Sequence, residues 1–570
     1  MTLDSFDSVS LEILWNRLIG ISEECWVTIG RTAFSMVIGE AQDYGCELLD
    51  ARGESLAHSP RSMPVFNLTL PRAVKVLLEH FPPASLEEGD VLVTNDPWTC
   101  AGHLFDIAAV SPVFRRGSLV GLVGSIAHWS DIGGSRDPLS VREIYEEGVQ
   151  IPPLKLYRRG EPNRDVIAMI YQNVRKPDMV IGDLLAQLAG NAVGTQRLVE
   201  LMDQYRLADL SELASAIQGR AETAMRGAIR ELPDGEYRHE VEFEAVDSVL
   251  TLPVCVSVHG DELTVDWAGA PPQVARGGVN CTYSYTAAHT AYALKCLLTP
   301  EIPSNSGDFR PFHVSAPEGS ILSCTYPAAV NVRTMTGWYL APAIFGALAP
   351  VLPDRVQAFT GMPMGVGVYG LERSGDAFND HLFQGGGQGA GRCCDGKSAL
   401  LFPTSAANTS VEMFENRTPI LVECKELIPD SGGAGRCRGG LGQRVRIRKL
   451  YDDDRPALVS LHPQGIEVAP SGLFGGVAGR LARIELAGDA GPALDHRSLG
   501  GLAELRRPSQ LLSVELAGGS GFGAPGERPL ADLQADYEEG FVTAGGLGDY
   551  GCTVTSTGDH EAVSREHGVL

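Results

Sequence analysis

Clusters of glycine between short apolar runs constrain the fold of this chain more than any other feature of its sequence. They gather beyond about residue 380, at Gly385-Gly386-Gly387, Gly432-Gly433, Gly439-Gly440 and Gly518-Gly519. Valine, isoleucine and leucine continue between the clusters, whereas a flexible linker would lack them. Glycine within a strand marks a bend or a close approach of two backbones. The sequence therefore predicts tightly turned β-structure in this part of the chain.

The N-terminal part carries helical and strand patterns instead. Leu11, Leu14, Trp15 and Leu18 follow the spacing of a helix face, and Ser8 or Ser10 could cap that helix. Another helix is predicted to begin at Pro71, and a long helical region is predicted over about 165–227. Strands are predicted at 91–93, 107–114 and 119–127, with a turn at 115–118.

The length of 570 residues exceeds what one hydrophobic core usually supports, so we expect a multi-domain α+β protein. The predicted N-terminal helix-and-sheet domain covers residues 1–230. A middle α+β domain covers 231–380, where 237–241 and 263–267 alternate like strands. The glycine-rich, β-containing domain covers 381–570 and is predicted to close with a helix from Pro529.

Charge and hydropathy exclude several classes of protein. The formal net charge is -25 and no basic stripe is present, so nucleic acid is not an expected partner. No apolar run approaches the roughly 20 residues of a membrane helix. The first residues are acidic and polar, unlike a secretory signal. The twelve cysteines include no Cys-x-x-Cys pair, which is typical of a reduced, cytoplasmic protein.

Two His-x-x-Asp units, His103 to Asp106 and His128 to Asp131, lie at the ends of the two predicted strands. If the strands form a hairpin about Arg116-Gly117, Phe105 lies opposite His128, and the two histidines become diagonal neighbours on one face. Asp106 would then point to the other face, because side chains alternate along a strand. It joins the histidines only if the strand begins irregularly.

Two imidazoles with one or two carboxylates suit a divalent Zn, Mn or Fe ion. Such an ion polarises a carbonyl group or lowers the pKa of bound water, which produces a nucleophile at neutral pH. Ordinary hydrogen-bonded histidines at strand ends are the alternative interpretation.

A formal phosphate-loop pattern occurs at Gly391–Ser398, but Pro403 stops any helix after one turn. The phosphate loop needs a strand before it and a helix after it, so we interpret the match as coincidence. The glycines at 385–389 and 435–440 could present amides to an anion, although tight turns are their commoner role. A serine-nucleophile elbow and a His-Glu-x-x-His motif do not occur.

Along nearly its whole length the chain resembles the hydantoinase B/oxoprolinase family. The segments that carry this resemblance are Arg31–Ser35, Asn95–Trp98, Gly102–Asp106, Asp131–Gly134, Glu143–Gly148, Ile151–Pro153, Gly182–Leu184, Asn408–Glu412, Gly432–Gly435 and Gly518–Gly523. Each segment is weakly specific by itself, whereas their shared order along the chain is strongly so.

The resemblance implies a B-type subunit of an ATP-dependent cyclic amidohydrolase. Such a chain works in a hetero-oligomer with an A-type chain that binds ATP and Mg, and opens hydantoin, 5-oxoproline or lactam rings. The family's divalent metal maps onto Asp43, His103, Asp106 and His128. Asp131 and Asp96 are then expected beside the metal ligands or on the substrate side.

Two alternatives remain within this resemblance. Related enzymes carboxylate ketones such as acetone and acetophenone, so the chain could be a carboxylase subunit. It could also be a non-catalytic scaffold for the A-type chain. The chain departs from the family pattern at residues 38–42, 100–102 and 66–68, where Phe66-Asn67-Leu68 replaces a usual His-x-Gly. These departures leave the ring substrate open.

Overall fold

The structure is a computed structural model that describes residues 6–488, 492–557 and 560–565. The described residues form two compact units. The first holds those up to Arg238 together with Pro253–Ala341 and Thr404–Ala406. The second holds His239–Leu252, Pro342–Pro403 and those from Ala407 onward. Helices and several separate sheets occur together, as expected for the α+β class.

A seven-stranded sheet forms the centre of the first unit, with strand order β2-β1-β5-β4-β3-β6-β7. Its strands are β1 (Tyr44–Asp50), β2 (Ser55–His58), β3 (Val91–Thr94), β4 (Asp106–Arg115), β5 (Ser118–His128), β6 (Leu154–Arg158) and β7 (Glu161–Pro162). The long β4–β5 hairpin was predicted from two short apolar runs and the turn at 115–118 between them, and both strands lie where the sequence placed them.

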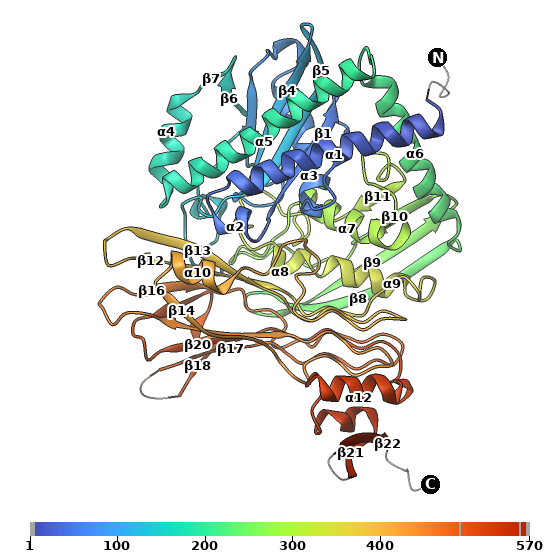
Figure 1. Ribbon diagram of the computed structural model, residues 1–570, viewed down its shortest axis with the longest axis vertical. Helices are drawn as coiled ribbons and strands as arrows, with labels where there is room; N and C mark the ends of the chain where they lie inside the picture. Colours follow the sequence, from blue (N-terminus) through green and yellow to red (C-terminus); the bar gives the residue numbers. More distant parts are fainter. Residues whose placement is uncertain (1–5, 489–491, 558–559, 566–570) are drawn as a thin grey trace. The chain divides into compact units, whose positions relative to one another are not determined.

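Helices cover both faces of this sheet. On one face, α1 (Ser8–Thr32) and α5 (Pro177–Gln204) run side by side (Figure 1), and they share an apolar core with β1 and β5. Asp7 caps α1, in place of the predicted Ser8 or Ser10. On the other face lies α3 (Pro64–His80), where Leu70 fills the space above Gly124 of β5.

The predicted start of α3 was wrong by two turns. The helix begins at Pro64 and contains Pro71 in its interior. In the sequence, both prolines suit the first turn of a helix, and the helix was predicted to begin at the later one. Apolar side chains at Val65 and Phe66 are buried, so the helix face extends further toward the N-terminus than predicted.

The predicted helical region of about 165–227 contains α4 (Arg164–Asn173), α5 and α6 (Ser211–Arg230). The short α2 (Met36–Gly39) lies outside that region and was not predicted. A four-stranded sheet comes next, in the order β11-β10-β9-β8, with β8 (Gly235–Glu244), β9 (Val249–His259), β10 (Glu262–Asp266) and β11 (Phe312–Ser315). The helices of this stretch are α7 (Tyr283–Leu298), α8 (Thr334–Gly337) and α9 (Leu340–Leu348).

Two sheets and a terminal hairpin make up the second unit. One sheet has the order β13-β12-β16-β19, from Met364–Leu371 (β12), Ala377–Gln384 (β13), Ala457–Ser460 (β16) and Leu502–Leu505 (β19). The other has the order β14-β15-β20-β17-β18, from Ile420–Leu427 (β14), Gln443–Lys449 (β15), Arg483–Ala487 (β17), Leu494–Asp495 (β18) and Leu511–Glu515 (β20). Three helices, α10 (Val411–Arg417), α11 (His496–Leu499) and α12 (Leu530–Glu538), precede the hairpin of β21 (Cys552–Thr557) and β22 (His560–Arg565).

Extended glycine-rich segments pack against one another in the second unit. We call them the glycine layer: residues 385–391, 432–442, 476–479 and 517–523. Main-chain hydrogen bonds join them, as from Gly387 to Ala517 (3.0 Å) and from Gly519 to Gly440 (2.9 Å). A Cβ on Gly387 would lie 1.8 Å from the carbonyl oxygen of Gly440, so these backbones approach closely because side chains are absent. The glycine clusters themselves hold isolated bridges rather than strands, so the predicted β-structure lies beside them and not within them.

Among the described helices, none combines the length and the apolar character that crossing a lipid bilayer requires.

Candidate metal centre

A β-bulge in the β4–β5 hairpin decides which side chains meet at its open end. Near the turn Arg115 pairs with Ser118, as predicted, but the register shifts by one residue between Val113 and Phe114. Asp106 consequently lies directly opposite His128. A shift of one residue turns every later side chain to the other face. The expectation that Asp106 points away from the histidines in a regular strand was therefore wrong.

His103, Asp106 and His128 form a group whose ligand atoms all lie within 4.8 Å of one another. Oδ1 of Asp106 lies 2.9 Å from Nε2 of His103 and 3.1 Å from Nδ1 of His128. His103 stands in the loop before β4, whereas the other two end paired strands. Both His103 and Asp106 are buried. The group could hold a divalent metal ion.

Asp43, which only the family resemblance had connected to the hairpin, comes close to this group. It directly precedes β1, and its carbonyl oxygen accepts a hydrogen bond from the amide of His128 (3.1 Å). Its Oδ2 lies 3.9 Å from Nδ1 of His128. Burial raises the pKa of Asp43 to about 6. A small side-chain movement would add it to the ligand set.

The hydrogen bonds of His103 suit a metal ligand. Its Nδ1 lies 2.8 Å from the carbonyl oxygen of Asn331, so Nδ1 carries the proton and Nε2 carries the lone pair. Burial and the charge of Arg333 lower the pKa of His103 to about 4, which leaves the ring neutral. Nε2 then turns its lone pair toward a carboxylate oxygen without forming a hydrogen bond. A cation between the two atoms removes that repulsion, so the residues fit a metal.

Arg333 holds the second oxygen of Asp106. Its Nη2 donates to Oδ2 of Asp106 (2.6 Å), its Nε donates to the carbonyl oxygen of Ala101 (2.8 Å), and its guanidinium stacks on Tyr285. Burial alone would raise the pKa of Asp106, but the charge of Arg333 helps to hold it well below its usual range. The carboxylate is therefore ionised, with Oδ1 directed at the two histidines.

Glu147 holds the segment that carries both Asn331 and Arg333. One of its carboxyl oxygens accepts hydrogen bonds from the amides of Val330 and Asn331, both 2.8 Å long. Burial raises the pKa of Glu147 to about 8. Sequence reasoning gave no role to Arg333, Asn331 or Glu147. Because Arg333 is 227 residues from Asp106, no local spacing could have joined them.

Asp131 and Asp96 lie outside the His103–Asp106–His128 group. Asp131 binds the backbone and side chain of Arg175 and accepts a hydrogen bond from the amide of Gly133 (3.1 Å). Asp96 accepts from the amide of Trp98 (3.0 Å), which shapes the loop that leads to His103. Both carboxylates thus organise loops next to the centre.

The phosphate-loop pattern lies in the second unit, as an irregular loop. In the described residues 391–403 no helix follows the glycines. Asp395 within this loop forms an ion pair with Arg528 (2.7 Å). The helix N-terminus that a nucleotide phosphate would need is therefore absent from this segment.

Comparison with known proteins relates the chain to one family over most of its length. The family model described as hydantoinase B/oxoprolinase matches residues 7–525. A putative D-/L-hydantoinase subunit from Pseudomonas sp. (strain NS671) is 30% identical, over 99% of this chain and 98% of that protein. The beta subunit of caprolactamase from Pseudomonas jessenii is 29% identical, over 99% of both chains.

Two solved structures are similar to this chain. The crystal structure of ATP-dependent caprolactamase from Pseudomonas jessenii has a TM-score of 0.88 at 28% identity, and the match covers 98% of both chains. A nucleotide-free structure of acetone carboxylase has a TM-score of 0.85 at 18% identity, over 97% of this chain and 81% of that one. At that identity the second likeness concerns the fold alone.

Proposed function

This chain belongs to the hydantoinase B/oxoprolinase family, and we propose that it is the metal-binding B-type subunit of an ATP-dependent cyclic amidohydrolase. Its substrate is a hydantoin, 5-oxoproline or lactam ring, and an A-type partner supplies the ATP site. The observation that carries this proposal is the group of His103, Asp106 and His128 at the end of a hairpin, where the first two are buried and His128 is half-buried.

The residues would divide the work as follows. Asp43, His103, Asp106 and His128 would hold a divalent Zn, Mn or Fe ion, whose Lewis acidity polarises an amide carbonyl or acidifies water. The Asn331 carbonyl keeps the Nε2 lone pair of His103 directed at the ion's position. Arg333 keeps Asp106 ionised and prevents its rotation. Asp131 and Asp96 keep the adjoining loops in place.

A partner chain follows from the similar proteins and from the chain itself. Both Pseudomonas relatives are named as subunits, and the similar caprolactamase structure is named as ATP-dependent. In this chain the only phosphate-loop pattern lacks its helix in the described residues. The proposed division of labour places ATP and Mg on the A-type chain, in a hetero-oligomer.

A ketone carboxylase subunit is the second candidate, because the fold resembles that of acetone carboxylase. Ring opening is favoured because two relatives of about 30% identity, the hydantoinase subunit and the caprolactamase subunit, carry names of cyclic amide hydrolases. Turnover that requires bicarbonate with the A-type partner would establish the carboxylase instead. If the chain is a non-catalytic scaffold, turnover with the A-type partner should be unchanged after the metal ligands are removed.

The first test is the metal content of the purified chain, compared with a His103→Ala/His128→Ala variant. We expect about one transition metal per wild-type chain and almost none in the variant. A matched control is His259→Ala/His313→Ala, which removes two exposed histidines and should leave the metal content unchanged. Equal, near-zero metal in all three proteins after metal-supplemented expression would overturn the proposal.

Glu147 offers a second test, because it acts on the centre only through Val330 and Asn331. Glu147→Ala should lower metal affinity by about 10- to 100-fold while the chain stays folded. Glu147→Gln keeps an oxygen that can accept both amide hydrogen bonds, so it should retain most of the affinity. Metal titration against a competing chelator measures both variants. Equal losses in both would contradict the positioning role.

A further inference from the structure

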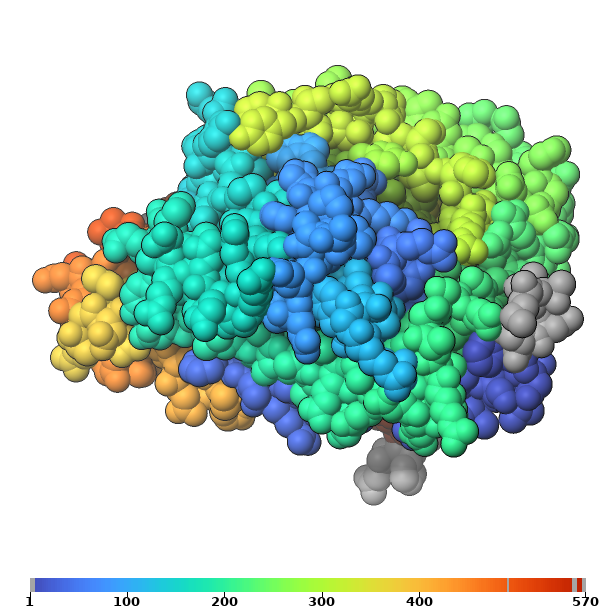
Figure 2. Space-filling view, turned by 90° about the horizontal axis from the view of Figure 1, so that it is seen from above, coloured from blue at the N-terminus to red at the C-terminus, as the bar shows by residue number. Residues whose placement is uncertain are grey.

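A cavity of about 900 Å³ lies in the first unit, on the same face of the seven-stranded sheet as the metal centre. Strands β1 and β2 form its floor, and α3, α7 and the loop at 300–314 form its walls. Figure 2 shows this side of the unit hollowed where blue segments meet light green and yellow ones. Of the described residues that line it, none is a predicted metal ligand. It is therefore a separate site.

Small and apolar side chains leave most of this space free. Ala287, Ala288 and Ala291 lie along one side of α7, and Leu68 and Phe309 face the same cavity. Alanines at these positions give α7 no bulk to fill the gap. A cavity of several hundred Å³ with a mainly apolar lining is typical of a small-molecule site.

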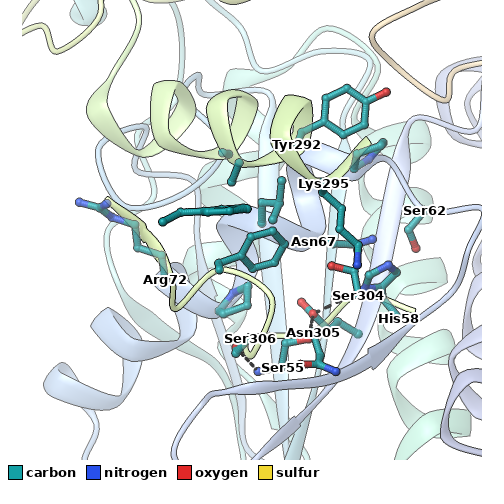
Figure 3. A pocket seen from close by; sticks show the side chains of 18 of the residues that line it. Ser55, His58, Ser62, Asn67, Arg72, Tyr292, Lys295, Ser304, Asn305 and Ser306 are labelled. Carbon is teal, nitrogen blue, oxygen red and sulfur yellow. Dashed lines mark hydrogen bonds and ion pairs between the residues drawn. The ribbon is translucent and has the colours of Figure 1, made fainter. Parts of the chain in front are cut away.

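Polar side chains gather at one end of the cavity, where Lys295 reaches from α7 toward His58 and Asn305 (Figure 3). The ammonium group of Lys295 donates to Asp308 and to Thr299, both at 2.9 Å. An ammonium group has three donors, so one remains for a further acceptor. This lysine is nearly buried, which makes the third donor valuable to a ligand.

Most charged residues that line the cavity are paired: Glu54 with Lys75 (2.7 Å) and Arg310 with Glu222 (2.9 Å), while Arg72 stacks on Tyr283. Asp308 balances Lys295 at 2.9 Å. Burial and the nearby Lys295 lower the pKa of His58 to about 4, so its ring is neutral. Burial raises the pKa of Glu47 well above its usual range, which favours the protonated acid. An ionised ligand group would therefore enter a desolvated site without a counter-charge.

Four polar atoms beside the cavity lack hydrogen-bond partners within the described residues: Oε2 of Glu47, Nδ1 of His58, Oδ1 of Asn67 and Nδ2 of Asn305. Buried polar atoms are nearly always paired, so this concentration is unusual. The atoms have almost no surface open to water, so a ligand would reach them only after their side chains rotate. They include both donors and acceptors.

We propose that this cavity is a second ligand site, which binds an uncharged small molecule with an amide- or urea-type group and an apolar body. The carbonyl of such a group accepts from Lys295 and Asn305, its N–H donates to Asn67, and its carbon skeleton packs between Leu68 and the alanines of α7. The inference stands on the cavity alone and does not require the metal centre to be catalytic.

The test is binding to the full, chelator-treated chain by isothermal titration, with three probes of similar size. ε-Caprolactam is neutral, hexanoate is an anion and hexylamine is a cation. We expect saturable binding of caprolactam, and binding of either ion weaker by about tenfold or more, because an unpaired buried charge costs over 1.4 kcal/mol.

Two tryptophan variants on α3 locate the bound probe. Leu68→Trp fills the cavity and should weaken caprolactam binding by about tenfold or more. Leu78→Trp on the same helix lies outside the lining residues and should leave binding unchanged. Circular dichroism establishes that both variants are folded.

Three outcomes would overturn the inference: no saturable binding of caprolactam, binding of hexanoate as strong as that of caprolactam, or binding unaffected by Leu68→Trp. Binding that survives in Leu68→Trp but is lost in His103→Ala/His128→Ala would place the probe at the metal centre. That result would remove the second site and leave the proposed function intact.

Discussion

The metal centre of the first unit and the glycine layer of the second are both tightly packed, but they are built from opposite parts of the chain. At the centre, buried side chains face one another, as Asp106 faces His103, His128 and Arg333. In the glycine layer, main chain packs on main chain, and a single Cβ on Gly387 has no room. The glycine layer is held by contacts between backbones, whereas the metal centre brings together polar side chains that could bind an ion.

The two regions should therefore fail in different ways. The glycine layer has its hydrogen bonds between main-chain groups, so added volume should harm it and pH should not. The first unit buries neutral histidines, so its stability should depend on which protons are bound. Three predictions test this contrast, from the largest expected effect to the smallest.

Gly387→Ala should destabilise the protein by more than about 4 kcal/mol, because the new Cβ would meet two other backbones. Urea unfolding of the purified chain measures the change. Gly526→Ala is the control, because a Cβ there has nothing within 4 Å, and it should stay within about 0.5 kcal/mol of wild type. If both variants were equally stable, the layer would not depend on backbone contact.

Acid should destabilise the first unit through His289. This residue of α7 is buried, and neither ring nitrogen has a hydrogen-bond partner in the described part of the chain. Burial and the charge of Arg333 lower its pKa to about 3. The unfolded chain, with an ordinary pKa of about 6.5, then binds the proton more readily. The contribution of neutral His289 to the stability of the folded protein is complete above about pH 6.5 and is lost as the pH falls toward 3.

Between pH 7 and pH 5 this loss should amount to about 2 kcal/mol. Urea unfolding at a series of pH values measures it. His289→Phe should reduce that loss of stability by the share of His289, while buried His58 and His103 still contribute. His259→Phe, at an exposed position, should leave the loss unchanged. If the stability of His289→Phe changed with pH as much as that of wild type, the acid sensitivity would come from other residues.

Gly219→Ala should have the opposite sign to Gly387→Ala. Gly219 lies in α6 of the first unit, and a Cβ there meets nothing within 4 Å. Alanine should stabilise the helix by about 0.5–1 kcal/mol, because glycine loses more backbone entropy on folding. A rise of a few degrees in Tm would be consistent with this. A loss of stability would show that the glycines of the two units are not so different.

Local patterns predicted much of the secondary structure around the site. The apolar runs at 107–114 and 119–127 and the turn at 115–118 were enough to predict β4 and β5. The bulge at Val113 and Phe114 was missed, although Pro112 directly precedes it and Gly121 lies opposite Val113. Proline and glycine within a strand often accompany a bulge, but they do not fix its position. The start of α3 was also mispredicted, because Pro64 and Pro71 both suit the first turn of a helix.

Some residues of the candidate site were predicted from local sequence patterns, and others were not. His103 and His128 were found from their spacing, and Asp43 only from the family resemblance. Arg333 and Glu147 were missed because they act through contacts across 227 and 183 or more residues of sequence. Long-range contacts of this kind leave no periodic trace in the chain.

The sequence by itself determined the mixed α+β class, the hairpin that carries the two histidines, and the family to which the chain belongs. These follow from side-chain alternation, turn residues and the order of motifs, all of which are local or linear properties. Only the tertiary structure decided that Asp106 faces His128, that Arg333 holds it, and that a second cavity lies beneath α7. Register and long-range packing depend on the energy of the whole fold, because one residue of slip reverses a face.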